Sequence, residues 1–479
     1  MKFNKLSVLC ALACAALSGQ AMAAMTAAQQ AVVNDANANN RVVYISGASA
    51  VQKGFTGIVA SLFTGTPTRF ANTTASSKDY EAVAGTLATS AGTWAAGSNV
   101  IVIYRTKGGS VQGVNPVARN EVIESLAVTA AACGATGSGT ATTPYVCSLG
   151  TRAPDAGVSD VAPALFHDAF NTEGEVAAPA LNAAELADLT ATPIYGLSFG
   201  VAVTKNVGLV NLNKAAISAI MTGNVGTWNQ VDASLPADDI LICRRVPGSG
   251  TQAVFNMYFG NYPCDTTGVT SNVPADRYAS AIWDDAAHNY TAVTPQGGLV
   301  VIENSTSGDV RNCLDKAVAG GVHTTKDRSG AAVSVNFGAG GHKAIGVLSM
   351  DSLSTSKTTG NWQFRSLDGA GTYTWDNLAG APVATGTGKF PTKASYVDGT
   401  WDEQGWISFN VPSRTVGNKK ALLDDFLVNA KSPAILASIA DLKNVAAAMP
   451  GTPDPTLTGL VLRAGYVNNN QCAPYNRNF

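Results

Sequence analysis

One short segment near the middle of the chain combines an arginine with glycines and hydroxyl side chains. Arg245 is followed, after Val246 and Pro247, by Gly248-Ser249-Gly250-Thr251. A guanidinium is planar and permanently charged, and its N–H groups form a fork that matches oxyanion geometry. Neighbouring hydroxyls and backbone N–H groups would add neutral donors, so this segment predicts a site for a tetrahedral oxyanion.

Two other turns have a related composition. They are Ser46-Gly47-Ala48-Ser49-Ala50 and Thr106-Lys107-Gly108-Gly109-Ser110. A turn that begins a helix presents unpaired N–H groups and the positive end of the helix dipole, which together favour an anion. Each turn taken alone is equally typical of a tight strand-to-helix connection with a capping residue.

Apolar runs before these turns predict the elements that position them. Val42–Ile45, Val100–Tyr104 and Ile240–Cys243 are typical of buried strands. Helical spacing follows the first run at Val51, Phe55, Ile58 and Leu62, and the third run at Val254, Phe255, Tyr258 and Phe259. Repeated strand–turn–helix units predict an α/β protein with a parallel or mixed sheet.

The beginning of the chain indicates export. Lys2 and Lys5 precede an apolar stretch, and Ala21-Met22-Ala23 is the small-x-small pattern of a cleavage site. We therefore expect a signal peptide at 1–23 and a periplasmic or secreted protein cleaved near Ala23. Cys10 and Cys14 lie in the apolar stretch without the pattern of a lipid-modified cysteine.

Charge and hydropathy exclude several partners. The 479 residues include 31 basic and 33 acidic ones, for a net charge of −2. This balance argues against nucleic acid or an anionic membrane surface as the partner. Beyond the leader, glycine, serine and charged residues interrupt every apolar run before it could span a membrane.

Six cysteines lie beyond the leader: Cys133, Cys147, Cys243, Cys264, Cys313 and Cys472. An even number in an exported chain predicts disulfides. Proximity in sequence favours Cys133–Cys147 and Cys243–Cys264, which leaves Cys313 with Cys472. A zinc site is the weaker interpretation, because no Cys-x-x-Cys or His-x-x-x-His spacing occurs. We expect no metal or cofactor.

Catalytic motifs are incomplete. Neither Ser49 nor Ser249 lies in a Gly-x-Ser-x-Gly elbow, and Gly388-Lys389 is followed by Phe390 where a Walker A motif needs serine or threonine. We therefore expect no enzyme activity.

Two segments have the composition of insertions. Residues 127–155 are rich in alanine, glycine and threonine, and 360–406 holds four tryptophans among glycine-containing turns. For the latter segment we expect β-structure, with core packing of the tryptophans favoured over a sugar-stacking platform.

Residues Ile242–Phe259 resemble the arginine and Gly-Ser-Gly-Thr segment of the periplasmic phosphate-binding proteins of ABC importers. Other stretches resemble further segments of that family in the same order: Gly47–Ala50, Thr106–Gly109, Gly157–Asp160, the set Ile217, Ile220, Gly223 and Trp228, and Ala344–Val347. The resemblance extends over roughly residues 41 to 440, with insertions.

The resemblance implies a role for each matching residue. Hydroxyl donors would be Ser49, Thr106, Ser249 and Thr251, backbone donors would be Ala50 and Gly250, Arg245 would supply the fork, and Asp160 would accept a proton from the ligand. The family usually has an aspartate, which restrains the arginine, where this chain has Pro247. Arg245 therefore needs a different restraint.

The resemblance also implies a two-lobed type II periplasmic-binding-protein fold with a hinge and an interlobe cleft. Lobe I would comprise 40–196 and 350–479, and lobe II would comprise 197–349. The expected function is binding of inorganic phosphate or a similar oxyanion by a monomer, for import through an ABC permease of the inner membrane. The alternative is a secreted surface, adhesion or scavenging protein on the same scaffold without a transport role.

Overall fold

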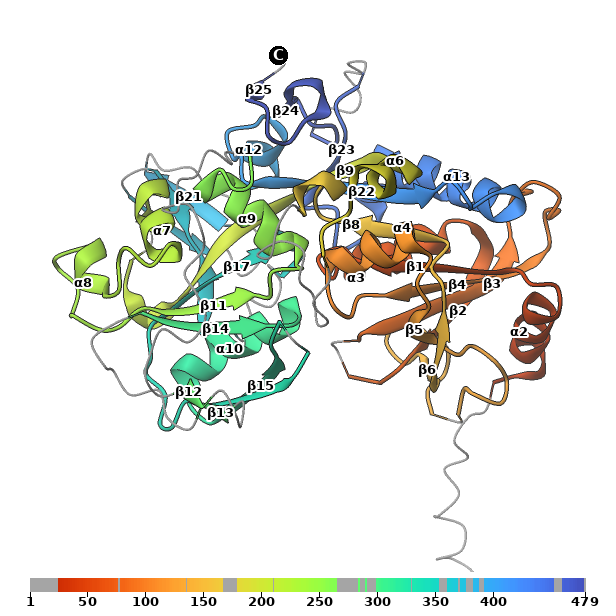
Figure 1. Cartoon of the computed structure of the whole chain (residues 1–479), viewed down its shortest axis with the longest axis horizontal. Helices are drawn as coiled ribbons and strands as arrows, with labels where there is room; N and C mark the ends of the chain where they lie inside the picture. Colours follow the sequence, from red (N-terminus) through yellow and green to blue (C-terminus); the bar gives the residue numbers. More distant parts are fainter. Residues whose placement is uncertain are drawn as a thin grey trace, which may run out of the picture.

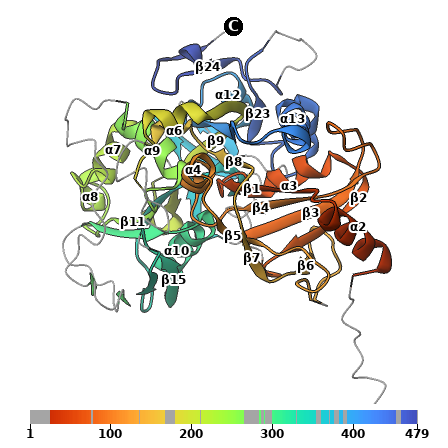
Figure 2. The same cartoon turned by 45° about the vertical axis from the view of Figure 1, so that its right-hand side comes forward.

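The computed structural model describes residues 25–75, 78–134, 136–166, 179–209, 211–264, 283–284, 289–290, 299–328, 330–352, 360–368, 371–375, 382–386, 392–451 and 459–477. The predicted leader and its cleavage site lie outside this part of the chain. Helices and strands gather in two groups, and β9 (Leu189–Thr204) lies between them in both views (Figures 1 and 2). The predicted two-lobed α/β fold is confirmed.

A mixed sheet runs through both groups. Its strand order is β14-β11-β17-β9-β22-β8-β1-β4-β3-β2-β6, and β18 and β23 also pair with β9. We call one group the β1 half, which contains β1 (Val42–Gly47), β2 (Phe63–Ala71), β3 (Tyr80–Leu87), β4 (Asn99–Arg105), β6 (Tyr145–Val146) and β8 (Ala156–Ser159). The other is the β11 half, which contains β11 (Leu241–Arg245), β14 (Val300–Asn304) and β17 (Ala344–Ser349).

Strand β1 shows why the β1 half is layered. Successive strand residues point to opposite faces, and Val43 packs in the same core cluster as Phe55 of α3 (Gln52–Ala60). Tyr44 packs in a separate cluster with Val33 of α2 (Ala27–Ala38). Helices thus cover both faces, which is why the strand is buried throughout, and the predicted strand and helix are confirmed.

The β11 half has the same layering. Ile242 packs with Phe255 of α9 (Gly250–Gly260) and with α7 (Lys214–Met221), while Cys243 faces α10 (Ser307–Ala319). The predicted strand–turn–helix unit is confirmed. The turn after β4 differs from expectation, because it leads into a 3-10 helix, Ser110–Gly113, before α4 (Asn115–Arg119). Pro116 lacks the N–H that an uninterrupted α-helix would need there.

Strand β9 changes partners along its length. Residues Leu189–Ser198 pair with β22 (Gln404–Pro412), and Phe199–Val203 pair with β17. β18 (Trp362–Phe364) and β23 (Ala446–Ala448) pair with it as well. One continuous strand therefore connects the two halves, and its partner changes between Ser198 and Phe199.

The segment 360–406 contains short strands, as predicted: β18, β19 (Ser366–Leu367), β20 (Gly371–Trp375) and β21 (Pro382–Gly386), followed by α12 (Lys393–Val397). Trp362, Trp401 and Trp406 are buried, which confirms core packing for these three. The side chain of Trp375 lies outside the described residues.

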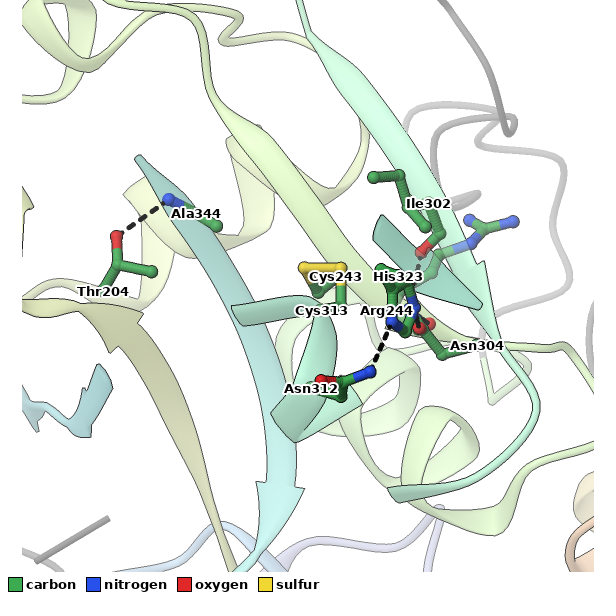
Figure 3. Close-up of a disulfide and its surroundings, with 9 residues drawn as sticks. All are labelled: Thr204, Cys243, Arg244, Ile302, Asn304, Asn312, Cys313, His323 and Ala344. Carbon is green, nitrogen blue, oxygen red and sulfur yellow. Dashed lines mark hydrogen bonds between the residues drawn. A yellow bond between two sulfur atoms is a disulfide. The ribbon is translucent and has the colours of Figure 1, made fainter. Parts of the chain in front are cut away.

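All six cysteines form disulfides, but two predicted pairings are wrong. Cys133–Cys147 is confirmed, whereas Cys243 pairs with Cys313 and Cys264 pairs with Cys472. Figure 3 shows the Cys243–Cys313 bridge between β11 and α10. Helix α9 has 11 residues, so it carries Cys264 roughly 16 Å away from β11. Proximity in sequence was misleading because this helix intervenes.

Candidate anion-binding site

Arg245 is a buried charged group where the two halves meet, with only 1% of its surface exposed. Its Nη1 donates to Ser49 Oγ and to Ser307 Oγ, each at 3.1 Å. Its Nη2 donates to the Ser305 carbonyl at 2.6 Å and its Nε to the Asn304 carbonyl at 3.2 Å. Ser49 follows β1, so the guanidinium connects both halves, and the structure brings the predicted Arg245 and Ser49 together.

A network of neutral groups restrains Arg245, since this chain has Pro247 where the family that it resembles usually has an aspartate. Asn304 Nδ2 donates to the carbonyls of Arg244 at 3.0 Å and Ile302 at 3.1 Å. Asn304 Oδ1 lies 2.8 Å from His323 Nε2 (Figure 3). The side-chain amide of Asn304 is therefore fixed at both its nitrogen and its oxygen. This holds the backbone carbonyl of Asn304 where Arg245 Nε donates to it.

His323, on β15 (Val322–Lys326), has a defined tautomer in this network. Burial lowers its pKa to about 4, so the ring is neutral at pH 7. Asn312 Nδ2 can only donate, and it lies 3.0 Å from Nδ1, so the proton is on Nε2 and points at Asn304. Sequence reasoning missed Asn304 and His323, because only the β14–β15 arrangement brings them behind Arg245.

Asp160 forms a second buried polar cluster directly after β8. It is 1% exposed, and its Oδ2 accepts a hydrogen bond from Thr251 Oγ1 at 3.2 Å. Its backbone N–H donates to Ser110 Oγ at 3.2 Å. Its Oδ1 is buried and accepts no hydrogen bond from the residues that the structure describes. A buried oxygen of this kind needs a donor from water or a ligand.

The pKa of Asp160 lies near neutral pH. Burial raises its pKa to about 7, although the charge of Arg245 and the hydrogen bond from Thr251 act in the opposite direction. The carboxyl can therefore either accept a proton from a ligand or donate its own.

Gly250 lies at a close contact between the two halves. A Cβ at this position would lie 2.3 Å from Ser110 Oγ and 2.6 Å from the Asp160 Cβ, so only glycine fits without a shift. Nearby, Val111 N donates to the Gly248 carbonyl at 3.0 Å. The Gly-Ser-Gly-Thr turn is thus packed directly against the β1 half.

Thr106 does not take part in the Asp160 cluster. Its Oγ1 donates to the carbonyls of Lys78 at 3.1 Å and Asp79 at 3.3 Å, which fixes the neighbouring loop. Ser110, four residues later, supplies the hydroxyl at Asp160 instead. Gly108 and Gly109, with φ of 84° and 75°, turn the chain toward that position. Sequence reasoning missed Ser110, although the glycine pair before it was a usable signal.

The remaining predicted residues lie at the starts of two helices. Ser249 is the N-cap of α9, and its Oγ accepts from Gln252 N at 3.4 Å. Thr251 lies in the first turn of α9 and Ala50 is buried just before α3. The positive end of the α9 dipole is therefore next to Asp160. The ligand contacts assigned to these residues stay predictions.

A cavity of about 220 Å³ lies beside Arg245. Ser49 and Thr106 line it from the β1 half, and Thr306, Ser307 and Arg311 line it from the start of α10. Two of these residues, Ser49 and Ser307, hydrogen-bond the guanidinium, so the cavity adjoins the arginine site.

No metal site or membrane-spanning helix is present in the described ranges. Within them, no group of three or more His, Cys, Asp or Glu side chains is arranged to hold a metal ion. The same residues contain no helix that is both long and apolar enough to cross a membrane.

Part of the chain is similar to a known protein family. Residues 135–363 match the PBP superfamily domain. No curated protein sequence matches the chain.

Solved structures similar to the chain include three that are all remote in sequence. A DING protein has 14% identity, a TM-score of 0.43, and covers 84% of this chain and 90% of its own. The high affinity periplasmic phosphate-binding protein PfluDING, bound with phosphate, has 13% identity, a TM-score of 0.41, and the same coverages, 84% and 90%. A phosphate-binding protein from Stenotrophomonas maltophilia has 12% identity, a TM-score of 0.36, and covers 83% of each chain.

Proposed function

We propose that the protein is a solute-binding protein for a protonated oxyanion, a function consistent with the match of residues 135–363 to the PBP superfamily domain. Inorganic phosphate is the leading ligand. The observation that supports it is the pairing of a buried arginine with a buried carboxyl: Arg245 supplies a positive fork, and Asp160 has one oxygen without a partner among the described residues. An anion that carries a proton can bind to Arg245 and share its proton with Asp160.

The two halves would move relative to each other when the ligand binds. Lobes at 40–196 with 350–479 and at 197–349 would move about the point where β9 changes partner, near Ser198 and Phe199. Opening would separate Ser49 and Asp160 from Arg245 and Thr251, which they contact in this structure, and closure would restore these contacts around the ligand. Delivery to an ABC permease from the periplasm fits such a hinge, because the partner can recognise the closed form.

Calorimetry with inorganic phosphate tests this proposal. Purified protein without its leader is expected to bind phosphate at a single saturable site. Ser110→Ala is expected to weaken this binding, because it removes the hydroxyl that lies at Asp160, whereas Ser234→Ala, in an exposed turn, should not. An absence of heat and of thermal stabilisation at millimolar phosphate would favour the surface or adhesion alternative.

The disulfide Cys264–Cys472 should limit how far the halves separate. Cys264 follows α9 in the β11 half, and Cys472 lies beside Gln471, whose Oε1 accepts from Ala162 N at 2.8 Å in the β1 half. Replacing both cysteines with serine is therefore expected to increase the dissociation rate of phosphate several-fold. Stopped-flow displacement measures this rate. The control variant carries Cys133→Ser and Cys147→Ser, which remove a disulfide that does not join the two halves. An equal increase in that variant would show that the Cys264–Cys472 disulfide does not limit the separation of the halves.

A further inference from the structure

The cavity beside Arg245 is larger than inorganic phosphate requires. A water molecule occupies about 30 Å³, so a cavity of about 220 Å³ has room for roughly seven, whereas phosphate has only five heavy atoms. The oxyanion cluster opens into this space through Ser49, which binds Arg245 and also lines the cavity. An oxyanion at Arg245 could therefore carry a substituent that extends past Ser49 and Ser307.

The charges around the cavity are predominantly acidic. Its lining includes four carboxylates, Asp79, Glu81, Asp351 and Asp441, and two cations, Lys78 and Arg311. Asp351 is 7% exposed, and its Oδ1 accepts from Ser349 Oγ at 2.6 Å and Ser352 Oγ at 3.3 Å. These bonds hold the Asp351 carboxylate in place at the wall.

Arg311 and Asp351 share a serine at the cavity wall. It donates to Ser352 Oγ at 2.9 Å, the same hydroxyl that bonds Asp351. Glu81 accepts from Gln52 Nε2 at 3.2 Å, and burial raises its pKa despite the charges of Lys78 and Arg69. Even with Glu81 protonated, the three aspartates of the wall exceed its two cations by one charge.

This excess has opposite consequences for two kinds of ligand. Inorganic phosphate at Arg245 brings no positive charge to these carboxylates, and like charges at short range in a poorly solvated site reduce its affinity. A phosphoryl group that carries a short amine would bring a compensating positive charge to the same wall. The unpartnered oxygen of Asp160 still requires the phosphoryl end to share a proton with it.

We propose that the natural ligand is a phosphoryl compound with a short aliphatic amine, whose oxyanion binds at Arg245 and whose ammonium group lies between Asp351 and Glu81. This inference rests on the proposed oxyanion function and specifies the ligand class. Asp351 and Glu81 then determine specificity, and Arg245 and Asp160 hold the group common to all ligands.

The experiment compares three probes by calorimetry: inorganic phosphate, ethyl phosphate and 2-aminoethyl phosphate. Ethyl phosphate matches the size of the amine compound without its charge. We expect 2-aminoethyl phosphate to bind at least about tenfold more tightly than ethyl phosphate, equivalent to about 1.4 kcal/mol. Asp351→Asn should reduce that ratio to less than about threefold, and Glu81→Gln provides a second variant if the first does not fold.

Asp424→Asn is the control, since this carboxylate lies on the surface of α13 (Gly417–Lys431) with 50% of its side chain exposed. It should leave the ratio unchanged. Equal affinities for ethyl and 2-aminoethyl phosphate, or a ratio that survives in Asp351→Asn and Glu81→Gln, would overturn the inference. Tight binding of inorganic phosphate with exclusion of both esters would also overturn it while the proposed function stands. If none of the three probes binds, the proposed function itself fails.

Discussion

Arg245→Ala is expected to abolish measurable oxyanion binding, with a loss of affinity on the order of a hundredfold or more. The guanidinium is the buried positive group that connects Ser49 of the β1 half with Ser307 of the β11 half. Charge-assisted hydrogen bonds are about twice as strong as neutral ones, so hydroxyls alone cannot replace it. Titration calorimetry with phosphate measures the loss, and the melting temperature of each variant shows whether it is folded.

The adjacent arginine provides the matched control. Arg244 points to the other face of β11, where its Nη2 pairs with Glu303 Oε1 at 2.8 Å, and Arg328 pairs with the same carboxylate. Glu303 is fully buried, so Arg244→Ala should lower the melting temperature by several degrees and change phosphate affinity by less than about threefold. Equal loss of binding in both variants would show that Arg245 is not the specific contact.

A conservative variant separates charge from geometry. Arg245→Lys keeps the positive charge but lacks the fork that reaches two hydroxyls and two carbonyls at once. Its affinity should fall between those of the native protein and Arg245→Ala. Restoration of full affinity by lysine would mean that charge alone matters.

Local patterns in the sequence were sufficient for the elements that carry the site. The β-branched run at Val42–Ile45 and the apolar run at Ile240–Cys243 both form strands, and helices follow each where the spacing indicated. These features depend on periodicity within a few residues and on burial of one face. Arg245 ends β11 and Ser49 follows the end of β1, and the two meet because these strand ends face each other where the two halves meet.

Features that depend on long-range packing were not predictable in the same way. The partner of Cys243 was decided by α10 packing on β11, 70 residues later in the chain. The hydroxyl at Asp160 comes from Ser110 and not Thr106, because two glycines with positive φ change the direction of the chain. The restraint on Arg245 comes from Asn304 and His323, which lie on different strands. Only the glycine pair before Ser110 is recognisable from a few consecutive residues; the partner of Cys243 and the restraint on Arg245 are not.

Asp160→Asn is expected to remove most of the selectivity of the site for phosphate over sulfate. At pH 8 the carboxyl, whose pKa is raised to about 7 by burial, is mostly ionised. Ionised Asp160 can accept a proton from hydrogen phosphate, whereas sulfate has none to offer and places a charge against a charge. The native protein should therefore favour phosphate by about a hundredfold. Asparagine can donate instead, so the variant should bind the two anions within about tenfold of each other.

The pH dependence gives this prediction an independent check. Below pH 7 native Asp160 gains a proton and can donate to sulfate, so the preference for phosphate should shrink between pH 8 and pH 6 and stay constant in Asp160→Asn. Asp160 also makes the stability of the protein without ligand depend on pH. The pKa of Asp160 in the folded protein lies above the ordinary value of 3.8, so its contribution to the free energy of unfolding is full below about pH 4. This contribution is lost as the pH rises through about 7. Urea titrations should show a loss of up to about 4 kcal/mol over this range in the native protein. Asp160→Asn should lack that loss, and a variant with unchanged anion preference and unchanged pH dependence would exclude Asp160 from the site.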